Sequence, residues 1–248
     1  EEEHQLQMFF DSLSRQQVAR LGWHAQAGES SDDAITRPLV LRAALYAQNA
    51  EAIAAAHDLF VAQQADLLAL PAEVRGLVLR NEVENYGNEA LFDQLLQAYV
   101  ASSDATFKRD IQGALTQTPD SDLIATLISK FEDANTIKPQ DLRAWYRGVL
   151  ANKHGQQAAW DWIRADWQWL EDTVGGDMEF TTYITVTAGI FQTAERLAEF
   201  KAFFEPKLPT PGLTREITMD IKVVETRVAL VEAEQEAVNA AIRAANND

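Results

Sequence analysis

The chain has 248 residues, of which 47% are hydrophobic, so it can form one large domain or an array of repeats. Its formal net charge of −17 argues against partners that carry phosphate backbones or anionic lipid headgroups. The absence of cysteine excludes disulfides and thiolate zinc sites, and it fits a cytosolic setting.

The apolar runs, the first residues and the composition of the chain indicate which class of protein it belongs to. No apolar run approaches the roughly 20 residues of a membrane span. The chain starts without methionine, in a stretch that already predicts helix, so we expect a fragment of a longer protein. With only 11 glycines and 7 prolines, the composition favours helix over a turn-rich β fold.

Apolar residues recur with helical spacing along nearly the whole chain, separated by short polar turns. In chain order, the predicted helices carry the apolar patterns of residues 6–13, 35–46, 53–60, 74–78, 91–99, 107–114, 123–131, 142–149 and 160–170. The second is predicted from Ile35, Leu39, Arg42, Ala43 and Tyr46. Residues that suit helix starts are Asn49, Pro71, Asn88, Ser103, Thr118 with Pro119, and Pro139.

Two segments near the C-terminus need separate arguments. Residues 179–191, EFTTYITVTAGIF, are rich in β-branched residues and could form a strand, but their apolar positions fit a helical face. We predict a helix there. From Thr214 to about Ala245 the apolar spacing predicts either one long helix or two consecutive ones.

The predicted helices form pairs that recur about every 35 residues, which is the period of helical-hairpin solenoids. The pairs are expected to begin near Thr36, Ala72, Asp104, Pro139, Met178 and Leu213. We therefore predict an all-α fold, a superhelical array of antiparallel helix pairs of the HEAT or armadillo type. A plain helical bundle is the alternative.

Four of the six tryptophans lie in residues 152–170, NKHGQQAAWDWIRADWQWL, which predict one helix. Trp160, Ile163, Trp167 and Leu170 would share one face of that helix, and Trp162 and Trp169 would form a second stripe. A helix with two apolar stripes is packed on two sides. We therefore interpret these tryptophans as core and not as a binding platform.

Residues that could carry chemistry are sparse. The four histidines are far apart, so no zinc motif is present. We expect His57 to be a hydrogen-bonded structural residue and His154 to be a solvated turn residue. Arg143 and Arg147 are four residues apart and share a helical face. They are either salt-bridge partners in an acidic protein or a carboxylate-binding position.

The order of several segments resembles the C-terminal helical domain of aminopeptidase N-type zinc metallopeptidases, the gluzincin aminopeptidases. The matching segments are ARLGW with TRPLVLRAALYAQNAEAIAAAHDLF, PAEVRGLVLRNEVENYGNEALFDQLLQAY, FKRDIQGALTQTPDSDLIATLISKF, IKPQDLRAWYRGVLANKHGQQAAWDWIRADWQWL and FQTAERLAEFKAFFEPK. FEPKLPTPGLTREITMDIKVVETRV is similar to lactic-acid-bacterial forms.

This resemblance implies that residues 1–248 are a single C-terminal domain of a longer aminopeptidase. The zinc motif and the exopeptidase loop of the family lie in an upstream catalytic domain, so this chain should be inactive by itself and need no cofactor. It would contact that catalytic domain, cap the active-site cavity and control the access of peptides in a cytoplasmic enzyme. No nucleic-acid or membrane partner is expected.

By the resemblance, the turn at Thr116 and Gln117 matches a cavity-facing position that is basic or polar in related peptidases. Gln140, Arg143 and Arg147 are the alternative cavity residues.

A freestanding helical scaffold that binds a partner protein is the rival function. The first reading predicts an exposed apolar patch near the N-terminal end of the chain, and the second predicts polar caps at both ends.

Overall fold

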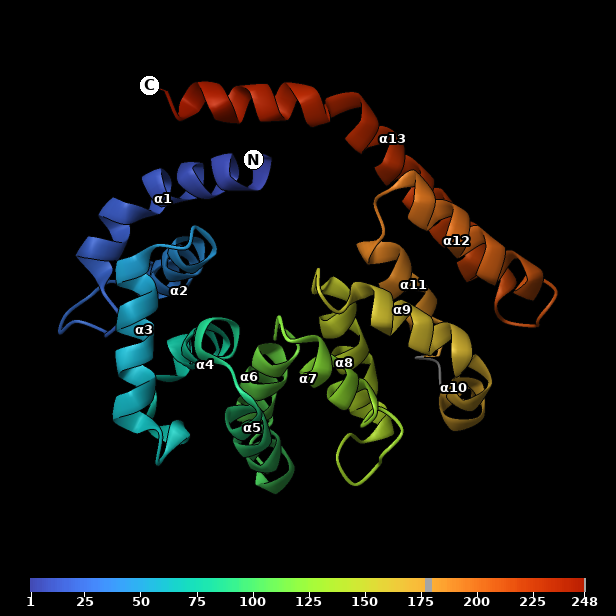
Figure 1. Ribbon diagram of the computed structural model, residues 1–248, viewed down its shortest axis with the longest axis horizontal. Coiled ribbons are helices and arrows are strands. Elements are labelled where there is room, and N and C mark those ends of the chain that lie inside the picture. The colour runs from blue at the N-terminus through green and yellow to red at the C-terminus, as the bar shows by residue number, and fades with distance from the viewer. Residues whose placement is uncertain (177–179, 248) are drawn as a thin grey trace. The chain divides into compact units, whose positions relative to one another are not determined.

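The computed structural model describes residues 1–176 and 180–247, and all regular secondary structure within these ranges is helical (Figure 1). The elements are α1 (Glu2–Leu21), α2 (Ser31–Tyr46), α3 (Ala50–Gln63), η1 (Leu67–Ala69), α4 (Ala72–Tyr86), α5 (Glu89–Ala101), α6 (Ala105–Leu115), α7 (Ser121–Ile128), α8 (Pro139–Ala151), α9 (Gln156–Ala165), α10 (Trp167–Val174), α11 (Thr182–Ile190), α12 (Ala194–Phe204), η2 (Glu205–Lys207) and α13 (Thr214–Ala245). The predicted all-α class is confirmed.

The chain divides into two compact units. Unit 1 comprises residues 1–118 and the end of the chain from Val238, and unit 2 comprises residues 119–237. The long helix α13 therefore contributes to both units. Among the described residues, no helix combines the length and the apolar character needed to cross a membrane.

Unit 1 is built on α4, which contacts α2, α3 and α6. The helices α1 and α2 form an antiparallel pair: the rings of Phe10 and Tyr46 meet edge to face at 5.3 Å near one end, and Arg20 bonds Asp33 near the other. The last turns of α13 lie against the start of α1, where the Asn246 side-chain amide donates to the carbonyl oxygen of Gln5 at 2.8 Å.

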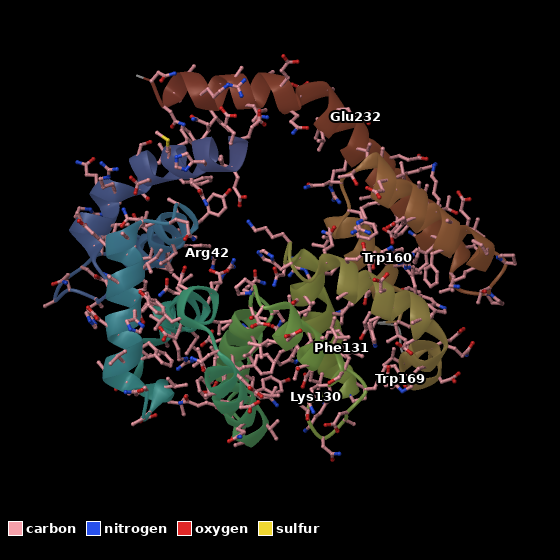
Figure 2. The ribbon with its side chains drawn as sticks, viewed as in Figure 1. Arg42, Lys130, Phe131, Trp160, Trp169 and Glu232 are labelled. Carbon is pink, nitrogen blue, oxygen red and sulfur yellow. The ribbon has the colours of Figure 1, made fainter. Side chains whose placement is uncertain are left out.

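Unit 2 is built around aromatic side chains, and its tryptophan-rich segment differs from the prediction. The single predicted helix is divided into α9 and α10 at Asp166, whose φ of −108° and ψ of 21° are not helical. The predicted burial is confirmed for Trp160, Trp162 and Trp167, while Trp169 is half-buried. Trp160, which is labelled in Figure 2, packs against three phenylalanine rings, those of Phe191, Phe203 and Phe204.

Several predicted helix starts are confirmed and two are corrected. Asn49 and Asn88 cap α3 and α5 with their side-chain oxygens, and Pro139 begins α8. The cap of α6 is Asp104 and not Ser103, and α7 is capped by Asp120 and not by Thr118. In both cases the longer acidic side chain, nearer the helix, accepts the backbone N–H bonds.

The pair period is visible in the helix starts. The first helices of successive pairs begin at Ser31, Ala72, Ala105, Pro139 and Thr214. The predicted start at Met178 lies outside the described residues. Residues 182–190 are helical as predicted, and α13 is one helix and not two. The stacking of the pairs into one superhelical array stays a prediction.

Candidate functional site

The helix α8 separates an apolar face from a polar face. It buries Leu142, Trp145, Tyr146, Val149 and Leu150. The spacing of three and four residues that places these side chains in the core leaves Gln140, Arg143 and Arg147 on the opposite side. Gln140 and Arg147 are exposed and Arg143 is half-buried, so these three candidate residues share one accessible face of unit 2.

The two arginines of this face have different surroundings. Arg143 donates from Nη1 to Oγ1 of Thr182, the first residue of α11, at 3.1 Å. This bond fixes Arg143 against the neighbouring helix. Arg147 forms no ion pair or hydrogen bond with another described residue. Of the two arginines, Arg147 is therefore the one that can bind an external anion without breaking an internal hydrogen bond.

Below this face, hydroxyl groups link α8, α11 and α13. Oγ1 of Thr187 donates to the carbonyl oxygen of Tyr183 at 2.8 Å, so the Tyr146 hydroxyl, 2.7 Å away, donates to Thr187. Burial raises the pKa of Tyr146 above its usual range, and this group stays neutral. The layer is fully bonded and gives α8 and α11 a fixed mutual position.

A buried carboxyl group completes the layer. Oγ1 of Thr185 donates to Oδ2 of Asp220 on α13 at 2.8 Å. Burial raises the pKa of Asp220, and the hydrogen bond from Thr185 offsets part of that shift. The accessible face thus presents Gln140, Arg143 and Arg147, while Tyr146 and Thr187 are buried. It can bind an anion, but it holds no nucleophile paired with a base.

Thr116 and Gln117 belong to unit 1. The other three candidates, Gln140, Arg143 and Arg147, belong to unit 2, so the two groups are treated as separate sites. Thr116 is only 1% exposed, and its hydroxyl donates to the carbonyl oxygen of Gln112 at 3.0 Å at the end of α6. Its hydroxyl therefore serves the helix end, which leaves half-buried Gln117 as the more accessible of the two candidates.

The histidines have the structural surroundings predicted for them. Nδ1 of His57 lies 2.8 Å from Oε2 of the buried Glu82, and its ring stacks on Tyr86 at 3.9 Å between centroids. His154 is exposed in the turn between α8 and α9. Within the described residues, no group of three or more His, Cys, Asp or Glu side chains is placed to hold a metal ion.

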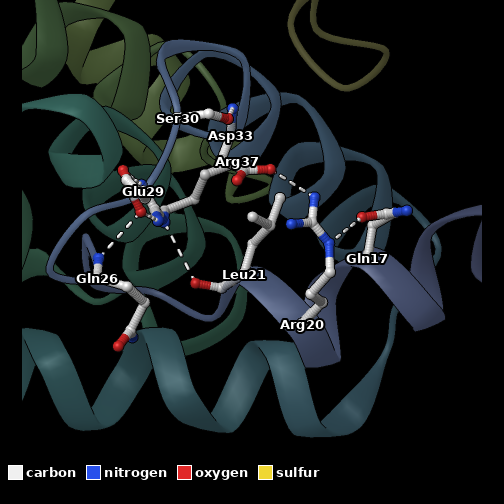
Figure 3. A network of polar contacts seen from close by, with 8 residues as sticks. All are labelled: Gln17, Arg20, Leu21, Gln26, Glu29, Ser30, Asp33 and Arg37. Atoms are coloured by element: carbon white, nitrogen blue, oxygen red, sulfur yellow. Dashed lines mark hydrogen bonds and ion pairs between the residues drawn. The ribbon is translucent and has the colours of Figure 1, made fainter.

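Sequence reasoning missed a buried ion pair in unit 1. Arg37, which is 1% exposed, pairs with the carboxylate of Glu29, and the Gln26 N–H donates to the same carboxylate at 2.9 Å (Figure 3). Arg37 is the main reason that the pKa of Glu29 lies below its usual range, and the Gln26 N–H adds to the effect. The network fixes the loop between α1 and α2. Glu29 lies in that loop and Arg37 lies in α2, so no helical spacing predicts the pair.

The helix order and these local features can be compared with known families. Residues 1–226 match the family model described as the ERAP1-like C-terminal domain. The chain belongs to the family of ERAP1-like C-terminal domains. This match covers α1 to α12 and the first part of α13, including the α8 face and the tryptophan-rich segment.

Curated relatives of this ERAP1-like C-terminal domain are peptidases. Aminopeptidase N of Lactobacillus helveticus is 54% identical over 97% of this chain and 29% of its own length. Aminopeptidase N of Lactobacillus delbrueckii subsp. lactis is 50% identical over 97% of this chain and 28% of its own length. Glutamyl aminopeptidase of Rattus norvegicus is 30% identical over 84% of this chain and 22% of its own length. The chain thus spans less than a third of the length of these relatives.

Proposed function

We propose that this chain is the C-terminal domain of a zinc-dependent aminopeptidase that removes N-terminal residues from peptides. The observation that carries the proposal is the match of residues 1–226 to the ERAP1-like C-terminal domain, together with aminopeptidase N relatives at 50% identity and above. The lack of cysteine fits a cytoplasmic enzyme.

The described residues do not fit a zinc site, because no three potential ligands converge. Because the chain spans only 29% of the Lactobacillus helveticus aminopeptidase N, we propose that the hydrolytic chemistry belongs to the part of the protein outside this chain, and that the role of this chain is to cap the active-site cavity and to control which peptides enter. Peptide is the expected partner, and the upstream catalytic part is the expected intramolecular contact.

The α8 face is the part of the cap that we assign to peptide contact. The guanidinium of Arg147 suits a peptide carboxylate because its planar fork can donate two parallel hydrogen bonds. Arg143 holds α8 against Thr182 and would position that face. Gln140, one turn before Arg143, can donate to or accept from a peptide backbone.

The aminopeptidase assignment is tested on the full-length protein. It should hydrolyse aminoacyl-arylamides, and a chelator should abolish that activity. The isolated chain should not hydrolyse aminoacyl-arylamides and should bind no stoichiometric zinc. One tightly held zinc per isolated chain, or a zinc-free active parent, would refute the assignment.

The role of the α8 face is tested by kinetics on the full-length protein carrying Arg147→Ala or Arg143→Ala. A contact far from the scissile bond acts on binding, so Arg147→Ala should raise KM for peptides more than it lowers kcat. Arylamides have no C-terminal carboxylate and should be hydrolysed as by wild type. Arg215→Ala, a change of another exposed arginine, is the control. If Arg147→Ala and Arg143→Ala both match wild type on both substrates, the two arginines only balance surface charge.

A further inference from the structure

One side of α2 carries an apolar stripe that is largely exposed, although Tyr46 at its end packs on Phe10 of α1. Ile35, Leu39 and Tyr46 are 65%, 58% and 40% exposed, and their spacing of four and seven residues places them on one side of the helix. The opposite side buries Arg37, Leu41 and Ala44. The helix therefore carries apolar residues on two sides, and only one of these sides faces the core of unit 1.

A cation lies within this stripe. Arg42 follows Leu39 by three residues and precedes Tyr46 by four, and its side chain is exposed (Figure 2). It forms no ion pair or hydrogen bond with another described residue. Single exposed apolar residues are ordinary on protein surfaces. An aligned set that combines aliphatic side chains with tyrosine and arginine has the composition of the centre of an interface.

We infer that this α2 stripe, Ile35, Leu39, Arg42 and Tyr46, is the surface on which the upstream part of the same polypeptide docks. The inference rests on the proposed function. The chain covers 29% of the Lactobacillus helveticus relative and matches a C-terminal domain, so most of such a protein precedes residue 1. The stripe lies on the second helix of the chain, beside α1, where that polypeptide would enter.

The stripe also specifies the chemistry of its partner surface. Covering Ile35, Leu39 and Tyr46 requires an apolar patch. Covering Arg42 without a counter-charge would leave a buried unpaired cation, which is strongly unfavourable. The docking surface of the upstream part therefore presents apolar side chains around one carboxylate that pairs with Arg42. A second copy of this chain is a poorer partner, because two chains of formal net charge −17 repel each other.

The first experiment is hydroxyl-radical footprinting of the full-length protein, with Leu68 as an internal control. Leu39 and Leu68 are the same residue type, and they are 58% and 51% exposed. Leu39 should be labelled several-fold more slowly than Leu68, at a rate that does not change on dilution. Equal labelling of the two leucines would overturn the inference. Protection of Leu39 that disappears on dilution would indicate a second copy and would overturn it as well.

The second experiment compares Leu39→Asp with Leu68→Asp in the full-length protein. Loss of an interface anchor should favour the undocked state by roughly tenfold or more, which footprinting at Tyr46 would report as increased labelling. Leu68→Asp should leave Tyr46 protected. Arg42→Ala should expose Tyr46 more than Arg42→Lys does, because lysine keeps the charge.

These outcomes are distinguishable from a failure of the proposed function. If the wild-type parent lacks chelator-sensitive arylamide activity, the aminopeptidase assignment is wrong whatever the footprint shows. If the parent is active but Leu39→Asp leaves Tyr46 as protected as in wild type, the docking surface is wrong and the assignment stands.

Discussion

Replacing Trp167 by alanine should lower the free energy of unfolding by about 3–5 kcal/mol, through lost burial and a residual cavity. The indole is only 7% exposed, and its ring lies 5.0 Å from that of Phe180 and 5.4 Å from that of Phe204. Trp169, two residues later in the same helix, is half-buried. Trp169→Ala should cost roughly 1–2 kcal/mol, since less apolar area returns to water. Both substitutions replace tryptophan by alanine in the same helix. The difference between their effects on the free energy of unfolding therefore measures the difference in burial.

The assay is chemical denaturation of this chain followed by tryptophan fluorescence. It reports on unit 2, because Trp23 is the one tryptophan outside residues 119–237. A change of midpoint with an unchanged slope would show a change in stability alone. If Trp167→Ala and Trp169→Ala cost the same, or if Trp167→Ala costs under about 1 kcal/mol with the fold intact, then Trp167 is not core and a binding platform must be reconsidered.

The same assay and differential scanning calorimetry check two further predictions. Asp220→Asn should raise the stability of unit 2 at neutral pH. The pKa of Asp220 is raised in the folded state, so the wild type carries the full cost of a buried charge at a pH above the folded pKa, and this cost disappears as the pH falls from the folded pKa to the ordinary one. The benefit should therefore fade towards pH 4, and a benefit independent of pH would contradict the reasoning. Gly155→Ala should cost about 1–3 kcal/mol, because the added Cβ would lie 2.7 Å from a methyl carbon of Val149, whereas Gly113→Ala in open space should gain up to about 1 kcal/mol. Equal effects of the two glycine changes would show that the close approach at Gly155 is relieved at little cost.

Periodicity and local caps predicted most of the helical architecture. The starts at Ala72 and Pro139, the helix at residues 182–190 and the burial of Trp160 all follow from short-range spacing. The break at Asp166 was not predictable in this way. One non-helical residue leaves the apolar positions before and after it facing the core, so the pattern reads as continuous across two helices.

The polar face of α8 was predictable, and the layer that supports it was not. Arg143 and Arg147 share that face because they are four residues apart in one helix. The partner of Arg143 is Thr182, which is 39 residues away, and the partner of Thr185 is Asp220, 35 residues away. Such pairs depend on how helices pack, and a single sequence does not contain that information in its spacing.

The helix α2 shows how a correct helix prediction can hide a functional signal. Its sequence pattern was clear because Ile35, Leu39 and Tyr46 recur with helical spacing, yet these residues are exposed. Its core face uses Leu41 and Ala44 together with the buried Arg37, and that set reads as mixed polarity. An apolar stripe that the domain does not bury costs solubility and yields no folding energy within it. We therefore propose that a partner surface covers the stripe, and a segment of the same polypeptide would be the partner with the largest effective concentration.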